Sequence, residues 1–173
     1  MDLEAVARRL ELEQLYTDYA HCLDADELER WPDFFTEDCF YRITSAENYE
    51  AGLPLGLIYA TSRNMLKDRI SALREANIYE PQRYRHLVSS IKIVTDLAEG
   101  PEALDLVANF LVVRTMQDGA MTIFGAGRYV DRVKRDTGSW KIASKIVVLD
   151  SRQIDTCWQS PSDVCAQTAA PGR

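Results

Sequence analysis

Residues 102–149, EALDLVANFLVVRTMQDGAMTIFGAGRYVDRVKRDTGSWKIASKIVVL, decide the fold class of this chain. Three long apolar runs within it are rich in β-branched and aromatic side chains, which favour strands. The Asp-Gly pair at residues 118–119 and the four residues Asp136–Ser139 separate these runs, and both are typical of tight hairpin turns. The stretch therefore predicts an antiparallel meander with strands over residues 102–117, 121–135 and 140–149.

The segments before this meander predict helices first and then two further strands. Apolar residues at helical spacing predict a helix over 3–23. Asp24 followed by Glu27 resembles a capping box for a second short helix, and Pro32 favours a further helical turn. The sequence then predicts a strand over 39–45, an apolar loop over 46–61, a helix over 64–76 and a strand over 83–97. Helices followed by antiparallel strands indicate an α+β fold, with a curved sheet wrapped around the N-terminal helix.

The bulk composition indicates a soluble globular protein. The chain has 173 residues, 46% of them hydrophobic and 27% charged, which suits one domain. We expect that domain to span residues 1–156 and a flexible tail, rich in Ser, Pro, Ala and Gly, to span residues 157–173. The net charge of −7 argues against a nucleic-acid partner. No apolar run is long enough for a membrane span and the charged N-terminal segment is unlike a signal peptide, so we expect a cytoplasmic location.

The cysteines and histidines do not form a metal-ligand pattern. The four cysteines include no CxxC pair, and the two histidines, His21 and His86, are far apart in the sequence. A Rieske cluster needs two Cys and two His at close pairwise spacing, and a mononuclear iron triad needs two His and a carboxylate. This chain alone is therefore a poor candidate for a metalloenzyme, and we expect no metal-binding residue in it. Cys22 and Cys39 are expected to be buried in the core.

The loop over 46–61 is unusually apolar for a loop. It carries Leu53, Leu55, Leu57, Ile58 and Tyr59. Exposed apolar loops are unfavourable in water, so this loop either folds over the core or docks on a partner.

A concentration of arginine follows this loop. Residues 62–94 hold five arginines in an acidic chain, and arginine is enriched at protein interfaces. On the expected strand, Arg83 and Arg85 share one face with Leu87, while His86 shares the other face with its neighbours Tyr84 and Val88. We interpret His86 as a packing or contact residue rather than a catalytic base. The candidate partner-interface residues are Arg69, Arg74, Tyr79, Arg83, Tyr84, Arg85 and His86.

Polar residues near the expected mouth of the sheet leave a second interpretation open. Tyr16, Tyr41, Asp38 and Asp24 either line a site or serve as core tyrosines and helix-end aspartates. The enzymatic alternative is a stand-alone dehydratase or isomerase that uses His86 or His21 with Asp38 and Tyr41. A third alternative is a non-catalytic ligand-binding dimer with an apolar cone.

Several segments resemble the small, or beta, subunit of aromatic-ring-hydroxylating dioxygenases, which has a cystatin-like (NTF2-like) cone fold. The block from Arg69 to Val88 is the most specific, and the turn at residues 77–80 resembles the terephthalate and salicylate/anthranilate branch. The resemblance spans nearly the whole chain to about residue 156, and the extension after it departs from the family. The segments are LDADELERWPDFFTEDCFYRITSAEN (23–48), NMLKDRISALREANIYEPQRYRHLVSSIKI (64–93), FLVVRT (110–115), FGAGRYVDRV (124–133) and WKIASKIVVLDSRQIDT (140–156).

The resemblance implies a non-catalytic structural subunit of a multicomponent oxygenase, with no catalytic, cofactor-binding or metal-binding residue in this chain. In such a complex a larger alpha subunit carries the Rieske [2Fe-2S] cluster and the mononuclear Fe(II). The implied assembly is an α3β3 hexamer with self-association of this chain around a threefold axis. The implied reaction hydroxylates an aromatic ring, on this branch an aromatic carboxylate, with O2 and electrons from NAD(P)H, which electron-transfer components deliver to the alpha subunit.

Overall fold

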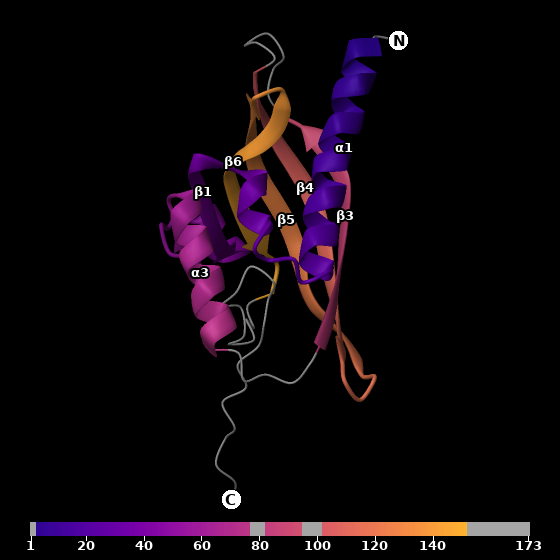
Figure 1. Cartoon of the computed structure of the whole chain (residues 1–173), viewed down its shortest axis with the longest axis vertical. Coiled ribbons are helices and arrows are strands. Elements are labelled where there is room, and N and C mark those ends of the chain that lie inside the picture. The colour runs from indigo at the N-terminus through magenta and orange to yellow at the C-terminus, as the bar shows by residue number, and fades with distance from the viewer. Residues whose placement is uncertain (1–2, 77–81, 95–101, 152–173) are drawn as a thin grey trace, which may run out of the picture.

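The predicted meander forms the centre of a six-stranded sheet. A computed structural model describes residues 3–76, 82–94 and 102–151. The sheet order is β2-β1-β6-β5-β4-β3 (Figure 1). Neighbouring strands are antiparallel except β1 and β6, which run parallel. The strands are β1 (Phe35–Ser45), β2 (Ile58–Ala60), β3 (Gln82–Ile93), β4 (Ala103–Met116), β5 (Met121–Asp136) and β6 (Ser139–Leu149).

Both predicted hairpin turns are confirmed. Gly119 has a φ of 87° in the turn between β4 and β5, a backbone conformation that favours glycine. In the turn between β5 and β6, Thr137 and Gly138 have φ values of 47° and 88°, as a two-residue hairpin turn of type I′ requires. These two turns set the register of β4, β5 and β6.

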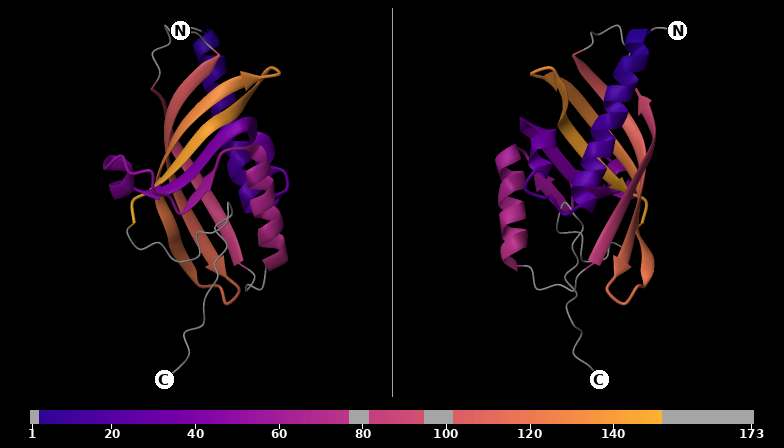
Figure 2. Two further views of the ribbon diagram at one scale, coloured as in Figure 1. Left: turned by 90° about the vertical axis from the view of Figure 1, so that its left-hand side faces the viewer. Right: turned by 45° about the vertical axis from the view of Figure 1, so that its right-hand side comes forward.

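The helices lie on and beside this sheet. They are α1 (Leu3–Asp24), α2 (Ala46–Glu50) and α3 (Arg63–Ala76), with a 3-10 turn, η1, at Trp31–Phe34 that begins around Pro32 as predicted. Figure 2 shows α1 lying across the hollow side of the curved sheet. The structure therefore confirms the α+β cone in which the N-terminal helix is wrapped by a mostly antiparallel sheet.

The core fills the space between α1 and the inner face of the sheet. Tyr19 of α1 packs in edge-to-face contacts against Phe34 and Phe35, with ring centroids 5.8 Å and 6.4 Å apart. Trp31 is fully buried, with its ring centroid 5.0 Å from that of Phe35. Aromatic pairs of this geometry contribute about 0.5–1.5 kcal/mol each beyond their buried area. Cys22 and Cys39 are buried in this core, as expected.

Two local predictions were wrong. The capping box at Asp24 does not begin a helix, because residues 25–30 form turns and the Asp24 carboxylate accepts a hydrogen bond from β3 instead. The segment 46–61 is not a loop throughout, since it contains α2 and β2. The Ser45 hydroxyl caps α2 by accepting a hydrogen bond from the backbone N–H of Asn48. The strand predicted over 83–97 extends past residue 94, so its predicted end lies outside the described residues. The tail predicted over 157–173 lies wholly outside them.

Candidate functional site

A buried ion pair occupies the interior of the cone. Lys145 on β6 donates a hydrogen bond of 2.6 Å to Asp131 on β5, and neither side chain is exposed to solvent. The Tyr16 hydroxyl of α1 donates to the same carboxylate oxygen at 2.5 Å. The other Asp131 carboxylate oxygen is buried without a hydrogen-bond partner in the described residues. The three groups tie the helix to the centre of the sheet.

Three tyrosine rings surround the Lys145 ammonium group. Its nitrogen lies 3.8 Å from the ring centroid of Tyr129, 4.8 Å from that of Tyr19 and 5.2 Å from that of Tyr16. Aromatic faces attract a cation at these distances. Desolvation by burial lowers the pKa of Lys145 and raises the pKa of Asp131, while their mutual attraction opposes both shifts. Burial and the Asp131 carboxylate raise the pKa of Tyr16 well above its ordinary value.

Sequence reasoning missed this cluster, although the sequence carries a signal for it. Tyr129, Asp131 and Val133 alternate along β5 and all face inward. A charged residue at an inward position of an alternating strand indicates a buried charge, which needs an opposite charge as partner. Lys145 supplies that partner from the neighbouring strand, where it is paired in register with Asp131.

A second buried contact joins the end of α1 to β3. The Asp24 carboxylate accepts hydrogen bonds from the His86 backbone N–H at 3.0 Å and from the His86 ring nitrogen Nδ1 at 2.7 Å. The two side chains are 12% and 2% exposed. Asp24 therefore satisfies a backbone donor on an edge strand and fixes the orientation of the imidazole ring.

A groove of about 540 Å³ lies beside this contact, between α1 and β3. Its lining includes Arg9, Glu13, Tyr16, His21 and His86. Several of these polar groups bind one another or the interior: Arg9 donates to Glu13 at 2.9 Å, and Tyr16 and His86 bind the aspartates described above. These four polar side chains are therefore engaged in contacts within the chain.

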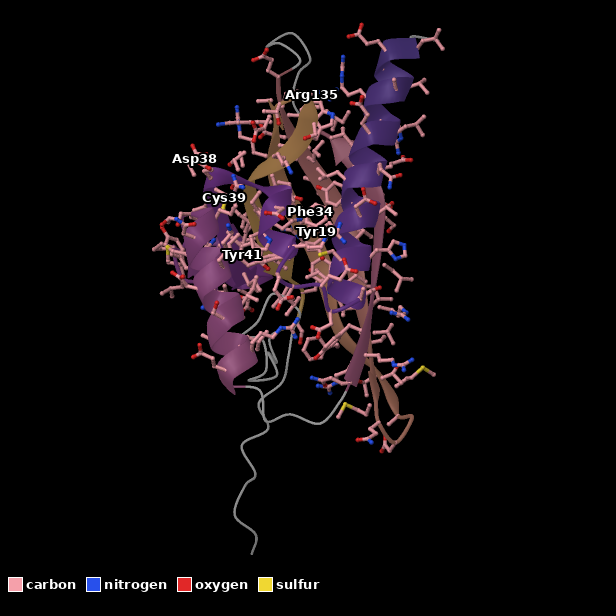
Figure 3. The ribbon with its side chains drawn as sticks, viewed as in Figure 1. Tyr19, Phe34, Asp38, Cys39, Tyr41 and Arg135 are labelled. Carbon is pink, nitrogen blue, oxygen red and sulfur yellow. The ribbon has the colours of Figure 1, made fainter. Side chains whose placement is uncertain are left out.

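The residue set of the dehydratase alternative does not converge. Tyr41 is buried in the core with its ring centroid 5.3 Å from that of Trp31, whereas Asp38 is exposed on β1. Figure 3 shows Asp38 on the far side of β1, away from Tyr19 and the helix. His86 lies on β3, and three strands separate β3 from β1 in the sheet. The structure therefore gives no acid–base site built from these residues.

The candidate interface residues on β3 divide between its two faces. Arg83, Arg85 and Leu87 are exposed on the face turned away from α1, as the alternation predicts. Tyr84 and His86 are buried on the inner face. Arg83, Arg85 and Leu87 are therefore open to solvent, and an interface role for Arg83, Tyr84, Arg85 and His86 stays a prediction.

The candidate interface residues on α3 also have neighbours within the chain. Arg74 donates to Asp26 at 2.8 Å and to Glu29 at 2.9 Å, and a third bond of 2.8 Å goes to the Asp26 carbonyl oxygen. These bonds join α3 to the turn that follows α1. Arg69 is half-buried, and Tyr79 lies outside the described residues. A contact of Arg69, Arg74 or Tyr79 with another chain stays a prediction.

The part of the chain that the structure describes contains neither a cluster of metal ligands nor a membrane-spanning helix. Among residues 3–76, 82–94 and 102–151, no group of three or more His, Cys, Asp and Glu side chains is placed to hold a metal ion. No helix within the same ranges is long and apolar enough to cross a membrane.

Comparisons with known proteins agree on one family. Residues 19–156 match the family model described as ring hydroxylating beta subunit. The small subunit of anthranilate 1,2-dioxygenase from Burkholderia cepacia is 40% identical over 151 residues, which are 87% of this chain and 92% of that protein. Subunit beta 1 of the terminal oxygenase component of terephthalate 1,2-dioxygenase from Comamonas sp is 42% identical over 143 residues, with coverages of 83% and 91%.

A solved structure shares both the fold and part of the sequence. It is a beta subunit from Novosphingobium aromaticivorans that is assigned to an aromatic-ring-hydroxylating dioxygenase. Its TM-score is 0.79 at 34% sequence identity, and the match covers 88% of this chain and 95% of that one.

Proposed function

Because this chain belongs to the family of ring-hydroxylating beta subunits, we propose that it is the structural, non-catalytic subunit of a Rieske-type aromatic-ring-hydroxylating oxygenase. The observation that carries this proposal is the interior of the cone, where Lys145, Asp131 and Tyr16 occupy the centre. A buried ion pair that joins α1 to two strands holds the helix and the sheet together, which supports a structural role for this chain.

The proposal assigns the redox cofactors to a larger partner chain. A Rieske cluster requires two Cys and two His ligands, and the Cys and His residues that the structure describes do not fit it. Cys22 and Cys39 are buried on different elements, and His86 is held by Asp24. The cluster and the mononuclear Fe(II) would therefore lie in the alpha subunit, which receives electrons through separate electron-transfer components.

The proposed substrate class is aromatic carboxylates. This class follows the names of the relatives at 40–42% identity, which act on anthranilate and terephthalate. The complex would use O2 and electrons from NAD(P)H to hydroxylate the ring. Since NAD(P)H serves the reductase, the proposal places the complex in the cytoplasm, as an α3β3 assembly.

Co-expression with the presumed large subunit tests the proposal. We expect the two chains to co-purify as one species whose iron follows the large chain, and we expect turnover of an aromatic carboxylate only when the large chain is present. The chain expressed alone should bind no iron. Turnover by this chain alone, or failure to bind any large iron-containing chain, would contradict the proposal.

A further inference from the structure

Four apolar side chains project into solvent along one edge of the described sheet. They form an apolar stripe that follows α2 and ends in β2, the strand that pairs with β1. The stripe consists of Leu53, Leu55, Leu57 and Tyr59, which are 42%, 60%, 45% and 51% exposed. Its three leucines therefore do not fold over the core. An exposed apolar surface of this kind is typical of a place that another segment or protein covers.

The end of β6 lies close to the apolar stripe. Residues 43–45 of β1 pair in register with residues 147–149 of β6. On the other side of β1, the Thr44 hydroxyl donates to the Leu55 carbonyl oxygen at 2.8 Å, and the Leu57 backbone N–H also donates to β1. Two strand spacings, or about 10 Å, therefore separate the end of β6 from the middle of the stripe.

The sequence that follows β6 carries apolar residues within reach of the stripe. It reads SRQIDTCWQS over residues 151–160 and includes Ile154, Cys157 and Trp158. An extended chain spans about 3.3 Å per residue, so residues 151–157 reach up to about 23 Å from the end of β6. Since this reach is more than twice the distance to the stripe, Ile154 and Trp158 can both contact the stripe of their own copy.

The surroundings of the stripe match the chemistry of this segment. Tyr59 packs edge-to-face against Phe40, with ring centroids 5.3 Å apart, and the Arg42 guanidinium lies 6.0 Å from the centroid of the Phe40 ring. An indole ring such as that of Trp158 packs favourably on aromatic and cationic groups. Asp155 supplies a carboxylate, which is a good hydrogen-bond partner for an arginine. The segment therefore complements the stripe in apolar surface and in charge.

We propose that the segment after β6 folds back over the apolar stripe of the same copy, with Ile154 and Trp158 packed on its leucines. The segment then acts as a strap that shields these leucines from solvent. Of the tail expected over residues 157–173, only the first residues take part in this contact. The inference goes beyond the proposed function, because neither the large subunit nor another copy of this chain takes part in it.

Disulfide trapping in the full chain tests this contact. The parent protein carries Cys165→Ser, which leaves Cys157 as the thiol of the segment, and the two cysteines of the core stay because they are buried. In the test variant, Leu55→Cys places a second thiol on the stripe. In the control variant, Leu87→Cys places it on β3, at a side chain that is 53% exposed against 60% for Leu55. Both side chains are exposed, so both variants should fold, which circular dichroism checks.

The control thiol is also within reach of the segment. Leu87 pairs with Leu111, Leu111 pairs with Ala126, and the Ala126 carbonyl oxygen accepts a hydrogen bond from the Asp150 backbone N–H. Three strand spacings, or about 14 Å, therefore separate Leu87 from the end of β6, and residues 151–157 can span this distance. A segment that moved freely would form disulfides at both positions, whereas a docked segment favours the position on the stripe.

The rates of disulfide formation distinguish these two cases. In oxidised glutathione, we expect Cys157 to form an intramolecular disulfide with Leu55→Cys at least about tenfold faster than with Leu87→Cys, a ratio that corresponds to about 1.4 kcal/mol of docking free energy. Non-reducing electrophoresis and peptide mapping report both products. Trp158→Ala should abolish the difference between the two rates, because it removes the largest apolar side chain of the segment.

A dye-binding measurement tests the contact without any added cysteine. Ile154→Ser with Trp158→Ser should raise the fluorescence of anilinonaphthalene sulfonate, because the stripe is then uncovered. Addition of Leu55→Asp and Leu57→Asp to the same variant should remove this rise.

Three results would overturn the inference. One is equal rates for the two thiols together with unchanged dye fluorescence. Another is a disulfide that joins two copies, which would assign the stripe to a second copy of this chain. The last is a Leu55→Cys thiol that alkylation reaches freely in the chain alone and that only the large iron-containing chain protects, which would assign the stripe to that partner.

Discussion

The ammonium group of Lys145 lies 2.6 Å from the carboxylate of Asp131, with both side chains fully buried between α1 and the sheet. Transfer of two charges from water to such a place is costly, and only their mutual attraction and further hydrogen bonds offset that cost. The Tyr16 hydroxyl and the surrounding tyrosine rings supply the additional contacts. The two residues therefore depend on each other. We expect their mutations to have non-additive effects on the free energy of unfolding.

Removal of one member of the pair should be far more harmful than replacement of both. We expect Lys145→Met to lower the free energy of unfolding by about 3–5 kcal/mol, because it leaves the Asp131 charge buried without a counter-charge. The double variant Lys145→Met with Asp131→Asn should be less destabilised than the sum of the two single variants. The Asn side chain keeps an acceptor for Tyr16. Urea unfolding of all four proteins gives the coupling energy, and additive effects would contradict this account.

The contact between Asp24 and His86 should stabilise the packing of α1 on β3. Asp24→Ala removes the acceptor of a backbone N–H and of a ring nitrogen, so we expect a loss of about 1–3 kcal/mol in the free energy of unfolding. Asp18→Ala on the exposed side of the same helix is the matched control and should cost less than about 0.5 kcal/mol. Equal effects of the two changes would show that the buried contact contributes little.

The buried cysteines should resist thiol reagents in the folded protein. Burial raises the pKa values of Cys22 and Cys39 to about 11, so roughly one thiol in a thousand is ionised at pH 8. In a variant with Cys157→Ser and Cys165→Ser, we expect Ellman's reagent to react slowly with the native protein and rapidly with both thiols in denaturant. Rapid reaction of the native protein would show that one of these side chains is accessible.

The bonds from Arg74 should make stability depend on pH. Hydrogen bonding to Arg74 lowers the pKa of Glu29 below its ordinary value of about 4.3. A carboxyl group whose pKa is lower in the folded than in the unfolded state stabilises the fold at pH values above its ordinary pKa. This contribution is lost as the pH falls through the folded-state pKa. The Glu29 side chain is 64% exposed, so its share should stay below about 1 kcal/mol.

This pH dependence is measured by a comparison of variants. Arg74→Met should lower the free energy of unfolding more at pH 7 than at pH 3.5, whereas Lys67→Met on the same helix should have little effect at either pH. If Arg74→Met lowered the free energy of unfolding equally at both pH values, the ionised Glu29 carboxylate would not contribute to stability through Arg74. A loss of assembly without a loss of stability would instead favour the interface role predicted for Arg74.

The features that could be predicted from the sequence are those with local causes. The turns at Gly119 and Gly138 were predictable because glycine in a short turn between strands has one common explanation. Likewise, alternation along β3 correctly separated Arg83 and Arg85 from Tyr84 and His86. The contact of Asp24 with His86 was missed. A carboxylate near a helix end gives the same sequence pattern whether it caps the residues that follow or accepts a hydrogen bond from a strand 62 residues away. Lys145 was missed because its partner lies on another strand.

The parallel pairing of β1 with β6 has a consequence for the order of events during synthesis. β6 is the last of the described strands in the sequence, yet it lies between β1 and β5 in the sheet. Until residues 139–149 have left the ribosome, the earlier strands form two fragments with unpaired edges on either side of a gap. Pairings between distant segments form slowly, and open edges favour aggregation. A protein that recognises the complete sheet can therefore bind only after β6 has closed this gap.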